Sequence, residues 1–288
     1  MIRRDLLSMC ELMLSGVTQK IRYVAKFIGK LVSSFPGVQF GELYYKYLER
    51  DKIYFLNLNK GNYDAEMILS DESKEEISWW SNTIENSFKT IKTPPTDEVI
   101  TTDASNLGWG AVYKDQTSGG QWDLEEEKMH INVLELKAVF FALKSFLANA
   151  HNKHIQIKTD NTTTVAYINN FGGVKSIECH KVARDIWEWA FARNNLLCAV
   201  HLPGSQNELA DKASRIFDTN TEWELDTDVF VEVCKTFGNF QIDLFASRLN
   251  AKLEKYVAWK PDPNAVCIDA FSIPWTNIGM FYAYPLTA

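Results

Sequence analysis

The segment from residue 97 to residue 217 alternates between short runs with strand patterns and longer runs with helical spacing. The clearest strand pattern is His154 to Thr159, where apolar and polar residues alternate as they do in a half-buried strand. The clearest helix is Asn132 to Leu147, where apolar side chains recur along one face. Mixed strands joined by crossover helices predict an α/β sheet covered by helices.

Six further elements are expected in this segment. We predict strands over residues 98–103, 109–113, 121–124 and 196–202, and helices over residues 177–193 and 207–215. These elements together require five strands, which form one sheet domain over residues 97–217.

The regions on either side of this domain have different patterns. Residues 1–96 are predicted to be mostly helical, with helices over 20–31, over 41–50 and from about Ser70, and with Pro94-Pro95 as a linker. Residues 218–288 carry a predicted helix over 228–237 and a predicted strand over 240–245, followed by a proline-rich stretch.

Composition limits the class of protein. Apolar residues make up 46% of the chain and charged residues 23%, which is typical of a globular protein. The five cysteines are scattered and form no C-x-x-C pair, so neither a disulfide framework nor a zinc site is indicated. Because no apolar run has the length of a membrane span or the form of a signal peptide, we expect an intracellular protein, cytoplasmic or nuclear, that has no membrane partner and is not secreted.

The net charge of −7 taken alone disfavours binding to nucleic acid. However, a metal-dependent nuclease needs clustered carboxylates, which are neutralised only when cations bind. One predicted helix is also locally basic, with Lys20, Lys26 and Lys30 among its residues. This helix either holds a nucleic-acid duplex or simply presents a solvated face.

Four acidic residues occupy special places in the central pattern. Asp103 and Asp160 end predicted strands, Glu135 lies in the first turn of a long helix, and Asp211 lies one turn into the last helix. Convergent carboxylates repel one another unless cations lie between them, and such oxygen ligands favour Mg²⁺ or Mn²⁺. Two such ions can activate water and stabilise the leaving oxygen of a phosphate ester.

Each acidic residue also has a purely structural interpretation. Asp103 could begin a turn, and Glu135 could complete a capping box with Asn132. Asp160 could cap the following helix, and Asp211 could favour a helix N-terminus electrostatically. The order strand-Asp, helix-Glu, strand-Asp, helix-Asp is far more specific than any single member.

Four stretches resemble the sequence blocks of retroelement ribonuclease H domains: "TTDASNLGWGAVY", "NVLELKAVFFAL", "IKTDNTTTVAYIN" and "HLPGSQNELADKASR". The resemblance implies a ribonuclease H-like mixed five-stranded sheet with flanking helices, and cleavage of the RNA strand of an RNA–DNA hybrid with two Mg²⁺ ions, Mn²⁺ being an alternative. It further implies that Asp103 bridges both metals and that Glu135 and Asp160 hold the ion near the leaving 3′ oxygen. Asp211 would hold the ion that activates water.

The resemblance suggests further site residues. His201 either assists proton transfer or is a histidine satisfied at a strand end. Asn207 would support the loop before the last helix. The short polar residues near the carboxylates either contact the 2′-hydroxyl of RNA or stabilise turns; they are Ser105, Asn106 and Asn161. Core packing rather than base stacking is expected of the tryptophans Trp109, Trp187 and Trp189.

The flanking regions resemble parts of a retrotransposon polyprotein of the DIRS type. "AKFIGKLVSSFPGVQFGELYYKYLERDK" and "EEISWW" are similar to the thumb and connection of its reverse transcriptase. "FQIDLFASRLNAKLEKYVAWKPDPNA" and "IDAFSIPW" are similar to the segment that follows ribonuclease H. The rest of such a polyprotein would then be a partner. Since no Tyr-x-Asp-Asp motif is present, polymerase activity is not expected of this chain.

Two other functions compete with a ribonuclease H. A catalytically silent nucleic-acid-binding or assembly remnant of a retroelement would also carry these blocks. An integrase or a proofreading exonuclease would share the fold, but an integrase lacks the carboxylate in the first turn of the first helix, and an exonuclease has its first two carboxylates on one strand. The wide separation of Asp103 and Glu135 therefore favours ribonuclease H.

Overall fold

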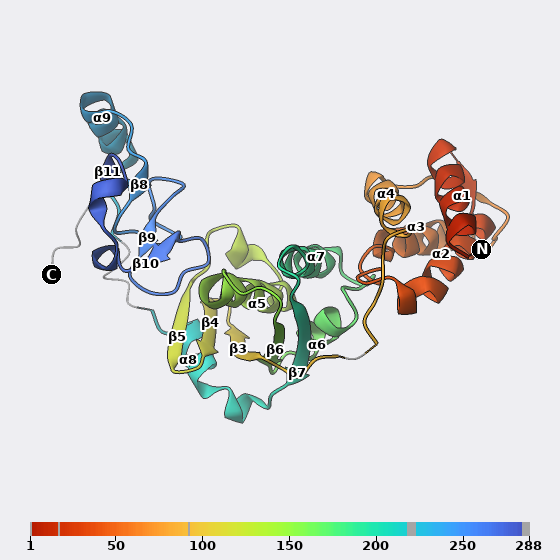
Figure 1. Ribbon diagram of the computed structural model, residues 1–288, viewed down its shortest axis with the longest axis horizontal. Helices are drawn as coiled ribbons and strands as arrows, with labels where there is room; N and C mark the ends of the chain where they lie inside the picture. The colour runs from red at the N-terminus through yellow and green to blue at the C-terminus, as the bar shows by residue number, and fades with distance from the viewer. Residues whose placement is uncertain (1, 17, 92, 218–222, 284–288) are drawn as a thin grey trace. The chain divides into compact units, whose positions relative to one another are not determined.

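The computed structural model describes residues 2–16, 18–91, 93–217 and 223–283 (Figure 1). Contacts divide the chain into two compact units: Met1–Pro95 with Ala166–Trp187, and Thr96–Val165 with Glu188–Ala288. The expected boundary after residue 217 meets residues 218–222, which lie outside the described residues.

The first unit contains four helices from the front of the chain: α1 (Ile2–Ser15), α2 (Ile21–Ser34), α3 (Lys46–Leu58) and α4 (Asp71–Thr83). A two-residue antiparallel pair, β1 (Gln19–Lys20) and β2 (Glu66–Met67), joins them. The expected apolar face of α2 is buried, and α4 begins near Ser70 as predicted, where the Ser70 hydroxyl accepts the N–H of Ser73 and caps the helix.

The helix expected over residues 41–50 is partly wrong, because α3 begins only at Lys46. The preceding residues form turns, and Phe40 has a positive φ of 63°. The indole of Trp80 donates a 2.6 Å hydrogen bond to the Tyr44 carbonyl oxygen. This contact stabilises the turn against a buried tryptophan, which a local pattern of apolar residues cannot reveal.

Part of helices α6 (Thr162–Asn169) and α7 (Ile177–Ala192) also belongs to the first unit. Aromatic rings join these residues to the front helices: Tyr47 meets His180 edge to face at 4.8 Å, and Phe40 meets Trp187 at 5.9 Å. Arg184 adds a 3.8 Å ion pair with Glu75. The first unit is therefore built from segments far apart in the sequence.

The second unit contains the predicted mixed five-stranded sheet with flanking helices, and this fold class is confirmed. The strands are β3 (Glu98–Ala104), β4 (Gly108–Tyr113), β5 (Gln116–Gln121), β6 (His154–Thr159) and β7 (Leu196–His201). Their order is β5-β4-β3-β6-β7, with β3, β6 and β7 parallel and β4 antiparallel to both of its neighbours. The carboxyl ends of β3 and β6 thus lie side by side.

The third strand was expected over residues 121–124, and this prediction is wrong, because β5 ends at Gln121. β5 contains two glycines and little apolar surface, so it lacks an ordinary strand pattern. A Cβ atom on Gly119 would collide with the Ala213 carbonyl oxygen of helix α8 (Glu208–Arg215). The glycine therefore permits close packing of a helix on the sheet.

Helix α5 (Ile131–Leu147) and α8 pack on opposite faces of the sheet. Trp109 of β4 contacts Phe141 of α5, whereas the next residue, Gly110, lies directly against the backbone of α8. Successive residues of a strand point to opposite faces. Trp109 and Trp187 are almost fully buried, as predicted for core residues, whereas Trp189, for which core packing was also predicted, is only partly buried.

The C-terminal segment, residues 223–283, forms helix α9 (Thr227–Phe237) close to the predicted range. The strand expected over 240–245 is reduced to β8 (Ile242–Asp243), which pairs in parallel with β11 (Phe281–Tyr282). A second parallel pair is formed by β9 (Val257–Ala258) and β10 (Cys267–Ile268).

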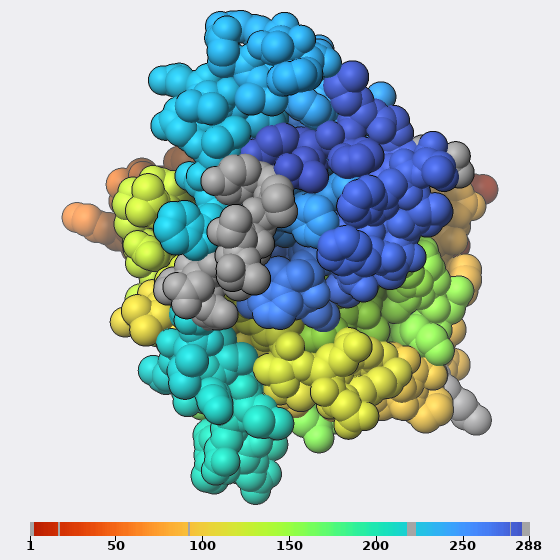
Figure 2. Space-filling view, turned by 90° about the vertical axis from the view of Figure 1, so that its left-hand side faces the viewer, coloured from red at the N-terminus to blue at the C-terminus, as the bar shows by residue number. Residues whose placement is uncertain are grey.

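The C-terminal segment packs against the sheet domain (Figure 2, blue against yellow). The guanidinium of Arg248 forms a 2.9 Å ion pair with Glu126 and donates to the Gln121 carbonyl oxygen. It also lies 4.8 Å from the ring centroid of Phe141. Within the described residues, no helix is both long and apolar enough to cross a membrane.

Candidate active site

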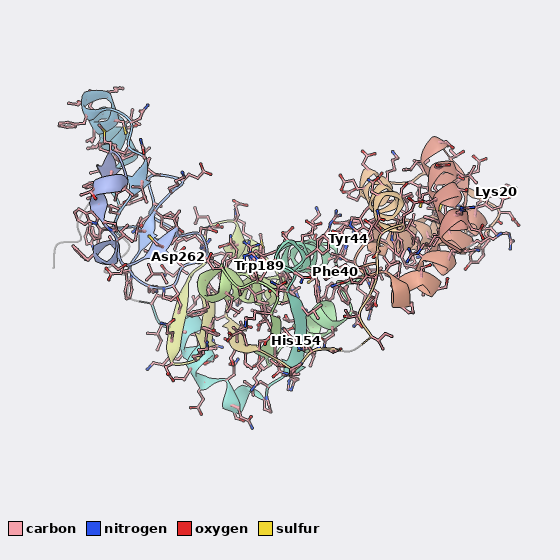
Figure 3. All side chains as sticks on the ribbon, in the orientation of Figure 1. Lys20, Phe40, Tyr44, His154, Trp189 and Asp262 are labelled. Atoms are coloured by element: carbon pink, nitrogen blue, oxygen red, sulfur yellow. The ribbon has the colours of Figure 1, made fainter. Side chains whose placement is uncertain are left out.

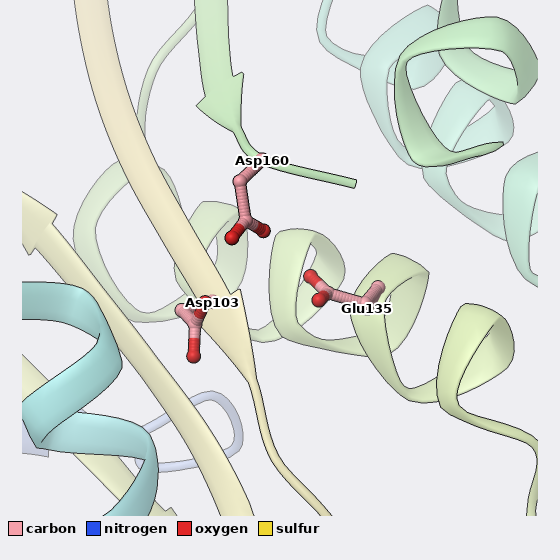
Figure 4. A group of neighbouring side chains, drawn as sticks. All are labelled: Asp103, Glu135 and Asp160. Atoms are coloured by element: carbon pink, nitrogen blue, oxygen red, sulfur yellow. The ribbon is translucent and has the colours of Figure 1, made fainter. Parts of the chain in front are cut away.

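Three carboxylates converge at the carboxyl ends of β3 and β6. Asp103 is the penultimate residue of β3, Asp160 directly follows β6, and Glu135 lies in the second turn of α5. One oxygen from each lies within 4.8 Å of the others (Figure 4). The sheet and one covering helix thus bring together residues that are up to 57 positions apart in the chain.

The capping interpretations of Glu135 and Asp160 are wrong. Helix α5 is capped by His130, whose Nδ1 accepts the N–H of Asn132, so Asn132 lies inside the helix. The cap before α6 is provided by Asn161, whose side-chain oxygen accepts the Thr164 N–H at 2.8 Å. Neither acidic side chain is needed for a helix end, and both are available to a ligand.

Two side chains from α8 and the loop before it orient Asp103. The Ser214 hydroxyl donates to Oδ2 at 2.7 Å, and the Asn207 amide donates to Oδ1 at 3.3 Å. The same amide donates to the Thr102 carbonyl oxygen at 3.1 Å, so Asn207 links its loop to β3. The Asp103 carboxylate is therefore held in one orientation at the centre of the cluster.

The cluster disfavours its own negative charge. Burial and then the charges of Asp103 and Asp160 raise the pKa of Glu135 to about 8. Burial, together with the charge of Asp160, raises the pKa of Asp103 to about 6. In addition, Oε2 of Glu135 is fully buried and has no hydrogen-bond partner within the described residues. A divalent cation would supply both the missing partner and the missing positive charge.

Asp211, the fourth predicted carboxylate, stands apart from this group. It lies on α8, and its Oδ1 accepts a 2.7 Å hydrogen bond from Nε of Arg215 one turn later. Its charge still raises the pKa of Asp103, which places the two carboxylates within electrostatic range. The positive charge of Arg215 partly compensates the same cluster.

The other predicted site residues occupy different environments. His201 ends β7, is exposed and pairs across the sheet with Thr159, the residue before Asp160. Ser105 is buried, and its hydroxyl donates to the Ser214 carbonyl oxygen. Asn106 is exposed in the turn after β3.

Asn161 and the three lysines complete the predicted set. Besides its cap, Asn161 donates to the Asn132 side-chain oxygen at 3.0 Å. In the first unit, Lys20 lies opposite Glu66 in the backbone register of β1 and β2, and Lys26 is exposed. The Nζ atom of Lys30 lies 4.0 Å from Oδ2 of Asp5, which makes a long ion pair.

Two residues in contact with the carboxylates, Ser214 and Arg215, were not predicted. They follow Asp211 by three and four positions, the spacing that places side chains on one helical face. This spacing was the available signal, and it could have placed both residues beside the cluster.

No protein-family model matches the chain. Over 134 residues the chain is 28% identical to the enzymatic polyprotein of cauliflower mosaic virus, strains D/H and Strasbourg. The match covers 42% of this chain and 19% of the polyprotein, so the chain spans about a fifth of the relatives it matches.

Two solved structures are also similar to parts of the chain. LC11-RNase H1 in complex with an RNA/DNA hybrid is 21% identical, with 40% of this chain and 91% of that chain covered and a TM-score of 0.35. The foamy viral protease-reverse transcriptase in complex with an RNA/DNA hybrid is 10% identical, with 77% and 29% covered and a TM-score of 0.26.

Proposed function

We propose that residues 97–217 form a metal-dependent endonuclease that hydrolyses the RNA strand of an RNA–DNA hybrid. The observation that carries this proposal is the convergence of Asp103, Glu135 and Asp160, with a buried oxygen of Glu135 that has no hydrogen-bond partner among the residues described. Oxygen ligands of this kind suit Mg²⁺ or Mn²⁺. The choice of hybrid as substrate rests on the four sequence blocks that resemble retroelement ribonuclease H domains.

The chain's own residues would divide the work between two ion positions. Asp103, Glu135 and Asp160 would hold one ion, and Asp103 with Asp211 the other. Bound ions lower the pKa of the attacking water and stabilise the leaving oxygen. Ser214 and Asn207 keep Asp103 oriented between the two positions. Arg215 holds Oδ1 of Asp211 and would compete with an ion for this carboxylate.

The remaining predicted residues receive separate roles in this proposal. His201 is exposed at the end of β7, where it can accept or donate a proton. Exposed Asn106 is the better candidate for contact with a 2′-hydroxyl, because Ser105 already holds the turn together. Lys20, Lys26 and Lys30 would contact the hybrid from the first unit.

The setting we propose is a fragment of a DIRS-type retrotransposon polyprotein. Residues 1–96 would be its thumb and connection-like region, and residues 218–288 the segment after ribonuclease H. The 28% identity to a viral enzymatic polyprotein supports a retroelement origin.

The test is cleavage of an RNA-labelled hybrid with Mg²⁺ by the wild-type chain, by Asp103→Asn and by Asp115→Asn. Asp115 is an exposed turn aspartate of the same domain and serves as the matched control. We expect Asp103→Asn to lose roughly three orders of magnitude in rate, because such residues act as a unit, and Asp115→Asn to match the wild type. Hybrid binding without wild-type cleavage would instead indicate a catalytically silent remnant.

A further inference from the structure

A groove with a volume of about 780 Å³ lies between the end of α5, the end of α7 and the C-terminal segment. All of its lining residues belong to the second unit. Figure 3 labels Trp189 on α7, which lines the groove, and Asp262 in the C-terminal segment, which directly precedes the lining residue Pro263. The charged lining residues are four cations and one acid: Lys144, Arg193, Arg248, Lys252 and Glu254.

Two of these cations are neutralised by ion pairs within the protein. Arg248 pairs with Glu126 at 2.9 Å, and Lys252 pairs with Glu224 at 3.0 Å. Both side chains are only 10% exposed, so these pairs attach the C-terminal segment rather than serve a ligand.

The other two cations, Lys144 and Arg193, have no acidic ion-pair partner among the residues that the structure describes. Lys144 donates to the neutral side chain of Asn264. Arg193 donates to the backbone carbonyls of Ala148 and Trp189, and its guanidinium lies 4.6 Å from the Trp189 ring centroid.

Burial is the main cause that lowers the pKa of Lys144, while the charges of Asp262 and Arg248 act on it in opposite directions. Four cations line this groove although the chain has a net charge of −7. An anion between Lys144 and Arg193 would place an opposite charge beside both side chains.

The size of the groove and the indole ring of Trp189 limit which anion could bind there. The groove runs along three elements, which suits an extended strand and is too small for a duplex. Trp189 and Arg193 together offer a flat ring and a stacked guanidinium, the combination on which bases of single strands pack. We propose that this groove binds a single strand of nucleic acid, with phosphates at Lys144 and Arg193 and a base at Trp189.

This site goes beyond the proposed function and assigns a role to the C-terminal segment, which forms one wall of the groove. It lies away from the carboxylates, because Lys144 follows Glu135 by nine residues on α5, about 13 Å along the helix axis.

The experiment measures fluorescence anisotropy of labelled single-stranded RNA and DNA oligonucleotides with the full chain in EDTA. We expect Lys144→Gln/Arg193→Gln to weaken binding at least about tenfold at low salt and to reduce the salt slope by about 1.4, that is, about 0.7 for each lost phosphate contact. The control Lys128→Gln/Lys235→Gln removes two exposed lysines of the same unit and should bind as the wild type does. Arg193→Lys keeps the positive charge and should restore most of the lost affinity.

The proposal is supported when single-stranded RNA or single-stranded DNA binds the wild-type chain and the double variant weakens that binding as described. Unchanged affinity and slope in the double variant would overturn it, as would equal competition by inorganic polyphosphate, which has no bases to stack. The binding assay is performed in EDTA and needs no cleavage, so a failure of the proposed cleavage would leave this test intact.

Discussion

Among the buried glutamates of the described residues, Glu76 in the first unit and Glu135 in the second both have a strongly raised pKa. Their side chains are 1% and 5% exposed, and burial is the main cause that raises each pKa to about 8. Burial alone therefore does not distinguish a structural carboxylate from one that serves a site.

The partners of the two carboxylates differ. Glu76 accepts the N–H groups of Tyr47 and Leu48 at the start of α3, at 3.2 and 3.0 Å, one with each oxygen. Within the described part of the chain, Oε2 of Glu135 has no hydrogen-bond partner, and the side chain faces two further carboxylates. Glu76 completes a helix end, whereas the charge of Glu135 has no such partner. The proposed metal site rests on this difference: an unpartnered oxygen beside like charges.

The largest predicted effect is a difference in the rate of hybrid cleavage between variants of the two glutamates. Glu135→Gln should reduce hybrid cleavage by roughly three orders of magnitude, because a neutral amide cannot replace the ionised ligand. Glu76→Gln should stay within a few-fold of the wild type, since its residue lies outside the carboxylate cluster. Rates measured with saturating Mg²⁺ check both variants, and similar losses in the two would remove the distinction.

The second prediction concerns the free energy of unfolding, for which Glu76 should matter. Glu76→Ala leaves two buried N–H groups unpaired and a cavity, so the first unit should lose about 3 kcal/mol. The control is Glu75→Ala, whose exposed 3.8 Å ion pair with Arg184 should contribute less than about 0.5 kcal/mol. Urea unfolding, with hydrogen exchange at the Tyr47 and Leu48 amides, checks this. Equal exchange in both variants would show that Glu76 is not structural.

Local patterns predicted most elements of the fold. The predicted bounds of β6 and the predicted start of α4 near Ser70 agree with the structure because alternation and helix-start signals are local properties of the chain. The residue range of β5 was predicted wrongly because its glycines do not form a strand pattern. The reason for Gly119 is its close contact with α8, almost a hundred residues later in the chain. Likewise, the late start of α3 depends on Trp80, a tertiary contact.

The sequence predicted which carboxylates could converge in the candidate site, but it did not predict how their side chains are oriented. Sequence order placed Asp103, Glu135 and Asp160 at converging ends of elements, and the structure brings these three together. It could not show that Asp211 instead accepts from Arg215, since either orientation is compatible with the same helix. The orientation of a side chain depends on which of several nearby groups binds it most strongly. The order of residue types along the chain gives no information on this.

The third prediction concerns that competition. Arg215→Gln removes the cation that holds Asp211, so the second Mn²⁺ equivalent should bind about fivefold more tightly, an effect of about 1 kcal/mol. Lys212→Gln, one residue after Asp211 on the same helix, should leave affinity unchanged because Lys212 is not an ion-pair partner of Asp211. Mn²⁺ titration followed by electron paramagnetic resonance checks this without any substrate. Weaker binding in Arg215→Gln would mean that Arg215 assists the ion rather than competing with it.

The last prediction concerns the pH dependence of stability, to which both glutamates contribute without metal and which Mg²⁺ should change only at Glu135. A carboxyl whose pKa is raised on folding keeps its proton in the folded state after the unfolded chain has lost it. The stability that it contributes is therefore full below pH 4.5, the ordinary value, and declines as the pH rises toward about 8.

The thermal midpoint in EDTA should accordingly fall as the pH rises across this range, by a few degrees for each kcal/mol lost in units of this size. Mg²⁺ bound at ionised Glu135 should remove the share of the decline that comes from the carboxylate cluster, and Glu135→Gln should remove the share that comes from Glu135. The largest share that then remains belongs to Glu76 and should disappear in Glu76→Gln. Differential scanning fluorimetry at several pH values measures both shares. A decline that Mg²⁺ leaves untouched would place the whole effect in the first unit and would contradict a metal site at Glu135.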